Sequence, residues 1–282
     1  GDTMKKFKKS LKILCIILII SISFYVGLYA IGSITKKLNI NTPNGYYLYD
    51  SNNILINGTS DQWISIKHIS HYLIDATISI EDKNFYKHKG FDILRNIKSF
   101  FVNLFSFSIK EGASTITQQY ARNTLLTNKR TIDRKLKEAF YTIQIERKYS
   151  KNHILEGYLN SLYFGHGLTG IDSASKYYFN KSPYELTIAE SAMLAAICNA
   201  PSLYSPSINI DKATSRQKYV LYLMLTQNYI SQEEYKNAIN ETINYNFEKE
   251  DYNNFYYYKD AVINKLTELN IYTKENLQKG IK

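Results

Sequence analysis

Proline, glycine and cysteine are all scarce in this chain of 282 residues, which has four prolines, twelve glycines and two cysteines. Because proline and glycine punctuate loops, their scarcity predicts few long loops and a mainly α-helical fold. Cys15 lies in an apolar run and Cys198 in a helical segment far from it, so we expect no disulfide between them. Two such cysteines say little about the redox compartment.

Several common binding motifs are missing as well. The sequence contains no phosphate-binding P-loop and no dinucleotide fingerprint. No second histidine or cysteine stands at metal-site spacing from His88, so we expect no dedicated metal centre. The basic residues are not organised into a reading helix with interleaved aromatic side chains, which argues against a nucleic-acid partner.

Acidic residues are outnumbered, with 25 Asp and Glu against 35 Lys and Arg, for a formal net charge of +10. The first twelve residues contain five of the lysines and one aspartate, and the rest of the chain keeps a net charge of +6. This excess suits an anionic partner such as a phosphate or an anionic membrane surface. Solubility alone explains it equally well.

The longest uncharged stretch runs from Ile13 to Ile34. As a helix its 22 residues would span about 33 Å, against a bilayer hydrocarbon core of about 30 Å. Lysines crowd its N-terminal side, so the positive-inside rule places residues 1–12 in the cytoplasm and the rest of the chain outside the membrane. A cleaved signal peptide is the alternative, but no small-x-small cleavage site follows the stretch.

Composition and periodicity divide the rest of the chain. Tyr46–Leu48 and Asn53–Ile56 flank a turn-prone trio and predict a short β-hairpin. Phe91–Phe107 is very apolar and is either a core helix or an interfacial segment resting on a bilayer. The predicted organisation is a basic cytoplasmic tail (1–12), a transmembrane anchor (13–34), a juxtamembrane segment with the hairpin (35–65), a helical domain (66–244) and a linker-like tail (245–282).

The clearest helix is predicted from Thr131, as N-cap, to Tyr149. One face is apolar, made of Ile132, Leu136, Phe140 and Ile143. The opposite face is charged and holds Arg130, Arg134 and Glu138. Taken alone, the charged face is an ordinary solvated surface with one (i, i+4) ion pair worth about 0.2–0.5 kcal/mol. Ser182 and Ser231 are predicted to begin two further helices as N-caps.

Two groups of side chains carry candidate chemistry. Glu81 follows the apolar segment Ile78–Ile80, and carboxylates in apolar surroundings are usable proton acceptors near neutral pH. Hydroxyl and amide side chains of the kind that recognise sugars and phosphates gather later, at Ser114, Thr115, Thr117, Gln118 and Gln119. The plain alternatives are a surface helix start at Glu81 and a turn without a ligand in the second segment.

Cationic side chains form a third group. Arg122, Arg130 and Arg134 can each bind a pyrophosphate through two parallel hydrogen bonds. Together the three groups supply a proton acceptor, hydroxyl and amide contacts for a sugar, and positive charge for a phosphate.

Five motifs occur in an order that one family shares. The first three are Glu81-Asp82-x-x-Phe85-x-x-His88-x-Gly90, Gly112-Ala113-Ser114-Thr115-Ile116-Thr117-Gln118-Gln119 and Arg134-Lys135-x-x-Glu138. The last two are Ile154-Leu155-Glu156-x-Tyr158-Leu159-Asn160 with Tyr163-Phe164-Gly165-x-Gly167-x-x-Gly170-Ile171, and Glu190-x-Ala192-x-Leu194-Ala195 followed by Pro201. From about Ser70 to Pro206 the sequence resembles the family 51 glycosyltransferase (transglycosylase) domain of class A penicillin-binding proteins and monofunctional transglycosylases. Ala113 and Arg122 depart from the glycine and lysine that are usual there.

The resemblance implies a mainly α-helical, lysozyme-like transglycosylase domain with a small jaw subdomain, preceded by one transmembrane helix and a short β-hairpin. It implies a single-pass cell-membrane enzyme whose extracytoplasmic domain polymerises lipid II into a growing glycan strand. The reaction inverts the anomeric centre and releases undecaprenyl pyrophosphate. Partners in a cell-wall synthesis complex are also implied.

Residue roles come from the same resemblance. Glu81 would be the general base, and Glu138 the second catalytic carboxylate, near the donor pyrophosphate. The implied substrate-binding residues are Asp82, Phe85, Ser114, Thr115, Gln118, Gln119, Arg122, Arg130, Arg134 and Lys135. No dedicated cofactor is implied, and Glu138 would position the pyrophosphate or a divalent cation, Mg²⁺ or Mn²⁺.

Two other functions stay open. A lysozyme-like glycan hydrolase needs paired carboxylates across one sugar and water as acceptor. A catalytically silent membrane scaffold would not need Glu81 and Glu138. No Lys-Thr-Gly occurs, and the Ser-x-x-Lys matches at Ser33 and Ser173 are explained by chance, so we expect this chain not to bind penicillin covalently.

Overall fold

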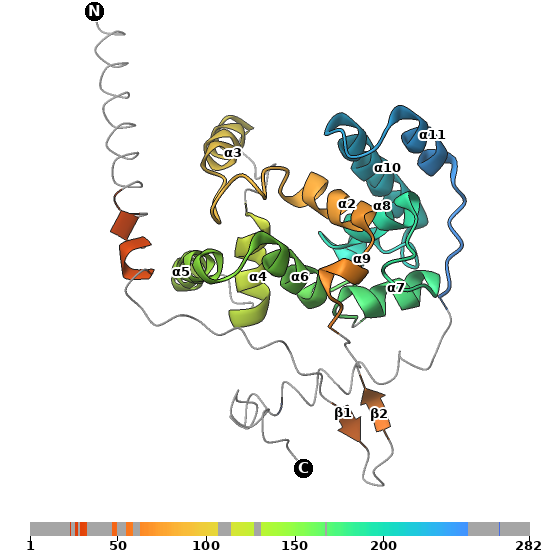
Figure 1. The fold of residues 1–282 in the computed structure, drawn as a ribbon, viewed down its shortest axis with the longest axis horizontal. Helices are drawn as coiled ribbons and strands as arrows, with labels where there is room; N and C mark the ends of the chain where they lie inside the picture. Colours follow the sequence, from red (N-terminus) through yellow and green to blue (C-terminus); the bar gives the residue numbers. More distant parts are fainter. Residues whose placement is uncertain are drawn as a thin grey trace, which may run out of the picture. The chain divides into compact units, whose positions relative to one another are not determined.

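The computed structural model describes residues 23, 26–27, 29–32, 47–49, 55–58, 63–106, 114–126, 131–166, 168–247 and 265 (Figure 1). The described part is mainly α-helical, in agreement with the predicted class. Among these residues no helix is long and apolar enough to cross a membrane. Most of the predicted anchor (13–34) and most of the predicted tail (245–282) lie outside them.

Between residues 63 and 247 the described residues form ten α-helices and one 3₁₀ helix. The 3₁₀ helix η1 is Ile66–His68, and α2 is His71–Glu81. They are followed by α3 (Ile93–Ser106), α4 (Ile116–Leu125), α5 (Ile132–Lys148), α6 (Lys151–Ser161) and α7 (Ile171–Phe179). The series ends with α8 (Ile188–Ile197), α9 (Pro201–Tyr204), α10 (Ile210–Thr226) and α11 (Gln232–Asn240).

Two short strands precede the helices. Strand β1 (Tyr47–Tyr49) pairs antiparallel with β2 (Leu55–Gly58), and the register shifts between Leu48 and Tyr49. The paired strands fall one or two residues later than the hairpin predicted over 46–56.

The chain divides into two compact units. Unit 1 comprises Gly1–Ile40 and Tyr86–Ile154, and unit 2 comprises Asn41–Phe85 and Leu155–Lys282. The candidate site residues are therefore shared between two bodies, which are described one at a time below.

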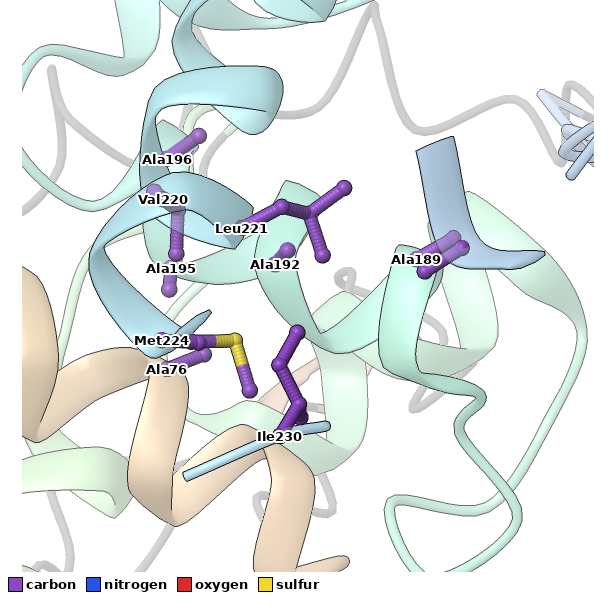
Figure 2. Close-up of a cluster of buried hydrophobic side chains, with 10 residues drawn as sticks. Ala76, Ala189, Ala192, Ala195, Ala196, Val220, Leu221, Met224 and Ile230 are labelled. Carbon is purple, nitrogen blue, oxygen red and sulfur yellow. The ribbon is translucent and has the colours of Figure 1, made fainter. Parts of the chain in front are cut away.

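The core of unit 2 is formed by α2, α8 and α10, which pack on one another. Helix α8 contributes four buried alanines, Ala189, Ala192, Ala195 and Ala196 (Figure 2). Larger side chains from α10 and the following segment fill the space around them, namely Val220, Leu221, Met224 and Ile230. Because interhelical distance depends on side-chain size, the alanines let the neighbouring helices approach closely. This core holds α2, the helix that ends at Glu81.

The helix predicted to begin at Ser182 begins five residues later. Ser182 and Glu185 instead close a short turn, in which Ser182 Oγ donates to the Glu185 carboxylate at 2.7 Å. The N-cap of α8 is Thr187, whose side chain accepts from the Glu190 N–H, while Glu190 accepts from the Thr187 N–H. The prediction was wrong because two capping patterns follow each other here, and the second one starts the helix. The capping box predicted at Ser231 is confirmed.

A side-chain clamp in unit 2 holds the segment that enters the helical domain. Glu156 on α6 accepts from Trp63 Nε1 at 2.7 Å and from the Ile66 N–H at 2.8 Å. One turn later, Asn160 accepts from the Ile64 N–H and donates to the Ile64 carbonyl, both at 2.9 Å. Glu156 and Asn160 of the fourth motif therefore bind the Trp63 side chain and backbone groups of Ile64 and Ile66.

In unit 1, α4 packs on α5 near Gly90, whose φ is +90°. A Cβ at Gly90 would lie 2.7 Å from Thr142 Cγ2 on α5, too close for two carbon atoms. The Gly90 carbonyl accepts from Thr115 Oγ1 at 2.6 Å, which ties this turn to the start of α4.

Gly90→Ala is therefore expected to lower the free energy of unfolding by about 2–4 kcal/mol, from backbone strain and overpacking together. Chemical denaturation of both proteins measures the difference. Gly27→Ala is the control, because Gly27 is helical and nothing lies within 4 Å of a Cβ there. Equal losses in the two variants would contradict this account of Gly90.

Candidate active site

Glu81 is the last residue of α2 in unit 2, and its exposed fraction is only 7%. The next residue, Asp82, leaves the helix with φ −158° and is fully buried, and its N–H still donates to the Ile78 carbonyl. Phe85 is also fully buried, and its N–H donates to the Asp82 carbonyl at 2.8 Å. The first motif thus forms a tight, buried turn directly after the candidate base.

Gln227 fixes the last turn of α2 by donating to the Ser79 carbonyl at 3.0 Å.

Cys198, for which the sequence predicted no disulfide and no other role, lies close enough to Glu81 for their charges to interact. Burial of the sulfur raises the pKa of the Cys198 thiol, and the negative charge of Glu81 raises it further. The thiol donates to the Leu194 carbonyl at 3.1 Å. A neutral thiol at the end of α8 is therefore a neighbour of the candidate base within unit 2.

In unit 1, the hydroxyl and amide segment builds the start of α4. Thr115 is the N-cap, and it forms a reciprocal capping box with Gln118, whose side chain accepts from the Thr115 N–H at 3.0 Å. Both residues are buried, and Thr117 donates to Glu146 on α5 at 2.5 Å. Capping therefore uses Thr115 and Gln118, two side chains that were predicted to bind substrate, and their contact with a sugar stays a prediction.

The other predicted contacts of this region are less buried. Ser114, Gln119 and Arg122 are half-buried at and after the start of α4. Arg130 lies outside the described residues.

Glu138 is fully buried on α5, between two cationic side chains. Arg134 Nη1 donates to one carboxylate oxygen at 2.9 Å, and Lys135 Nζ donates to the other. Arg134 Nε is buried and has no hydrogen-bond partner, while the Arg134 side chain is 17% exposed and that of Lys135 is 50% exposed. The third motif therefore forms a cluster with two positive charges and one negative charge, and Glu138 holds the two cations together.

The structure inverts the amphipathic pattern expected for the first half of α5. Ile132 is 81% exposed and Leu136 is 42% exposed, although the apolar face was expected to be the buried one. Glu138, on the face expected to be solvated, has no exposed surface. The interpretation of this face as an ordinary solvated ion pair is therefore wrong. The apolar face is buried only in the second half of α5, where Ile143 is 2% exposed.

Helix α3 also presents apolar side chains outward. Ile93, Leu94 and Ile97 are 57%, 80% and 40% exposed. For these residues the core-helix alternative is wrong, and the interfacial alternative remains.

Sequence reasoning missed a polar cluster around His166 in unit 2. His166 Nε2 lies 2.7 Å from Ser207 Oγ and 3.2 Å from Ser205 Oγ, and its ring stacks on Tyr177. Tyr178 joins the cluster through Ser205 at 3.1 Å. The only signal in the sequence was the run of glycines in the fourth motif, at Gly165, Gly167 and Gly170, and glycines do not indicate these partners.

Burial lowers the pKa of His166 below its ordinary value of 6.5. The unfolded chain therefore binds a proton there more readily than the folded protein. The stability that neutral His166 contributes is present above about pH 6.5 and is lost as the pH falls through the lower folded value. We expect the stability advantage of the wild type over His166→Gln to shrink between pH 7.5 and pH 5 in denaturant titrations. An advantage that is constant across this range would contradict the prediction.

A metal centre was not expected from the sequence, apart from a divalent cation at Glu138. Among the described residues there is no group of three His, Cys, Asp or Glu side chains that could hold a metal ion. Both oxygens of Glu138 accept hydrogen bonds from cationic side chains, and the divalent cation expected near this carboxylate stays a prediction.

Comparison with known proteins gives one consistent family. Residues 51–225 match the family model described as transglycosylase. Penicillin-binding protein 2D of Bacillus subtilis is 44% identical over 211 residues, which cover 73% of this chain and 30% of the relative. Penicillin-binding protein 1F of the same organism is 44% identical and penicillin-binding protein 1A of Aquifex aeolicus 39% identical, over 66% and 71% of this chain and 26% and 28% of those relatives.

The chain thus spans less than a third of the length of these curated relatives. Among solved structures, penicillin-binding protein 1A from Haemophilus influenzae is similar at 22% identity with a TM-score of 0.44, over 83% of this chain and 25% of that one. That score is too low to support a structural argument. The family model, by contrast, matches more than half of the chain, and the chain therefore belongs to the transglycosylase family, with residues 51–225 as its transglycosylase domain.

Proposed function

We propose that this chain is a peptidoglycan glycosyltransferase that polymerises lipid II into glycan strands. The observation that carries the proposal is the charge cluster of α5, where Arg134 and Lys135 are held by the buried Glu138. Two cations held in place suit a pyrophosphate leaving group, because guanidinium and ammonium groups stabilise phosphate charge. A hydrolase that cleaves glycosidic bonds between sugars releases no pyrophosphate, so it does not need these two cations.

In the proposed reaction Glu81 takes the proton from the 4-hydroxyl of the acceptor sugar. The freed oxygen attacks the anomeric carbon of the donor strand, a new carbon–oxygen bond forms, and the bond to the pyrophosphate oxygen breaks with inversion. The leaving group departs as undecaprenyl pyrophosphate. The buried turn at Asp82 and Phe85 supports this role, because a base on a rigid scaffold keeps its carboxylate in one place.

On the donor side, Arg134 and Lys135 would offset the charge of the pyrophosphate. The buried Arg134 Nε, which has no hydrogen-bond partner, is a donor available to a phosphate oxygen. Glu138 would orient both cations.

The exposed apolar side chains of unit 1 support a membrane location. Ile93, Leu94 and Ile97 on α3, with Ile132 and Leu136 on α5, expose large apolar surfaces. Such residues are found where a protein rests on a bilayer, which is where a lipid-linked donor is held. The proposed setting is the extracytoplasmic face of the cell membrane, with other cell-wall synthesis proteins as partners.

The test is product analysis with lipid II in detergent, using the purified chain and gel separation of the strands. A ladder of long strands is expected. Short muropeptides released from finished glycan would instead identify a hydrolase. If the chain bound lipid II but formed no product, the result would support a catalytically silent scaffold and overturn the proposal.

A further inference from the structure

The carbonyl of Gly32 is held by two side chains of α5, more than a hundred residues later in the sequence. Gln144 Nε2 donates to the Gly32 oxygen at 2.7 Å, and Arg147 Nη1 donates to it at 2.5 Å. Gln144 is buried, with 3% of its surface exposed. Residues 29–32 are helical, and Gly32 is the last described residue of that segment. All three residues belong to unit 1.

The backbone at Gly32 also approaches α5 very closely. A Cβ at this position would lie 3.0 Å from Ile143 Cγ2 and 3.7 Å from Ile143 Cβ. Gly27, five residues earlier, would have nothing within 4 Å of its Cβ. The lack of a side chain at Gly32 therefore allows the close approach to Ile143, whereas Gly27 makes no comparable contact.

The chemistry of the two donors suits a backbone carbonyl presented by another helix. An arginine and an amide donor on a neighbouring helix satisfy such a carbonyl. The contact is thus more specific than apolar packing alone.

We propose that Gln144, Arg147 and Ile143 form a docking site on α5 for the helical residues 29–32, and that Gln144 and Arg147 are positioning residues for the donor cluster. Arg147 lies nine residues after Glu138, about 14 Å along the same helix. A rigid helix joins the two, so the dock sets the place of Arg134 and Lys135 relative to residues 29–32. This positioning role rests on the proposed function, whereas the docking contact does not.

Engineered cross-linking tests the contact directly. The 3.7 Å between the two Cβ positions is close to the mean Cβ separation of a disulfide, about 3.8 Å. In a Cys15→Ser/Cys198→Ala background, Gly32→Cys with Ile143→Cys is expected to form a disulfide under mild oxidation, seen as a mobility shift on a non-reducing gel. Gly27→Cys with Ile143→Cys is the matched control and is expected to stay reduced. Failure of the first pair in folded protein, or equal cross-linking of both pairs, overturns the dock.

Activity on two donors tests the positioning role. The wild type, Arg147→Gln, Arg147→Lys and the neighbouring control Lys148→Gln would be assayed with lipid II in vesicles and with a short-chain, water-soluble donor. Arg147→Gln is expected to lose about tenfold in kcat/KM on the vesicle donor and to change little on the soluble one. Arg147→Lys, which keeps the charge, should recover part of the loss, and Lys148→Gln should behave as the wild type.

The outcomes separate the two proposals. Equal losses on both donors would mean a general structural role for Arg147 and would overturn positioning. No loss on either donor would overturn it too. A wild type that is inactive on both donors would overturn the proposed function, while the cross-linking result would still decide whether the dock exists.

Discussion

Glu81→Gln is expected to abolish glycan strand synthesis while the fold stays intact. Glutamine keeps the shape of the side chain but cannot accept the proton of the acceptor hydroxyl, and a positioned general base contributes about 10²–10⁴-fold to rate. We therefore expect kcat on lipid II to fall by at least about 100-fold, with a melting temperature close to that of the wild type. Strand length on gels and thermal unfolding measure the two quantities.

Asp75→Asn is the matched control, because Asp75 lies on the same helix, α2, and is half-buried. Burial raises the pKa of Asp75, so replacing its carboxyl group with a neutral amide should cost little. This variant is expected to keep wild-type synthesis. Unchanged strand synthesis in Glu81→Gln would contradict the assignment of Glu81 as the general base.

Glu138→Gln is expected to destabilise the protein by about 3 kcal/mol and to reduce activity as well. The change removes the negative charge from a fully buried site and leaves Arg134 and Lys135 close together without it. Breaking a buried ion pair from one side costs about 3–5 kcal/mol, and the partial exposure of the two cations favours the lower end. Denaturant unfolding measures the loss, and kcat/KM on lipid II measures the effect on the donor side.

The same helix provides the comparison. Asp133 and Lys137 form an (i, i+4) pair at 2.7 Å, with side chains 71% and 57% exposed. Asp133→Asn should therefore change the free energy of unfolding by no more than about 0.5 kcal/mol, since exposed pairs are worth little. If Glu138→Gln and Asp133→Asn were equally mild, the burial of Glu138 would have no energetic consequence and its role as the organiser of the cations would be wrong.

The starts of α5 and α11 were predictable because their signals are local. The box that caps α11 and the N-cap Thr131 of α5 involve residues three positions apart, so the sequence contains both partners. The start of α8 shows the limit of this reasoning. Ser182 and Thr187 both open a capping pattern, and which one becomes a helix depends on packing against α2 and α10.

The candidate site was less predictable than the helices that carry it. The ordered motifs pointed to the family, but Thr115 and Gln118 turned out to cap α4, where both are buried. Cys198 and His166 carried no sequence signal of their partners, because those partners come from distant segments. The contact of Gly32 with Gln144 and Arg147 joins residues more than a hundred positions apart, and no local pattern records it.

The amino-acid sequence by itself determined the helical class of this protein, the position of its main charged helix and its membership of the transglycosylase family. Only the tertiary structure decided which face of that helix is buried. Amphipathic periodicity predicts that apolar residues turn inward, yet Ile132 and Leu136 are exposed while Glu138 is enclosed. The physical reason is that the neighbouring elements and the charge partners of Glu138 decide which side chains are buried. The periodicity of one helix holds no information about either.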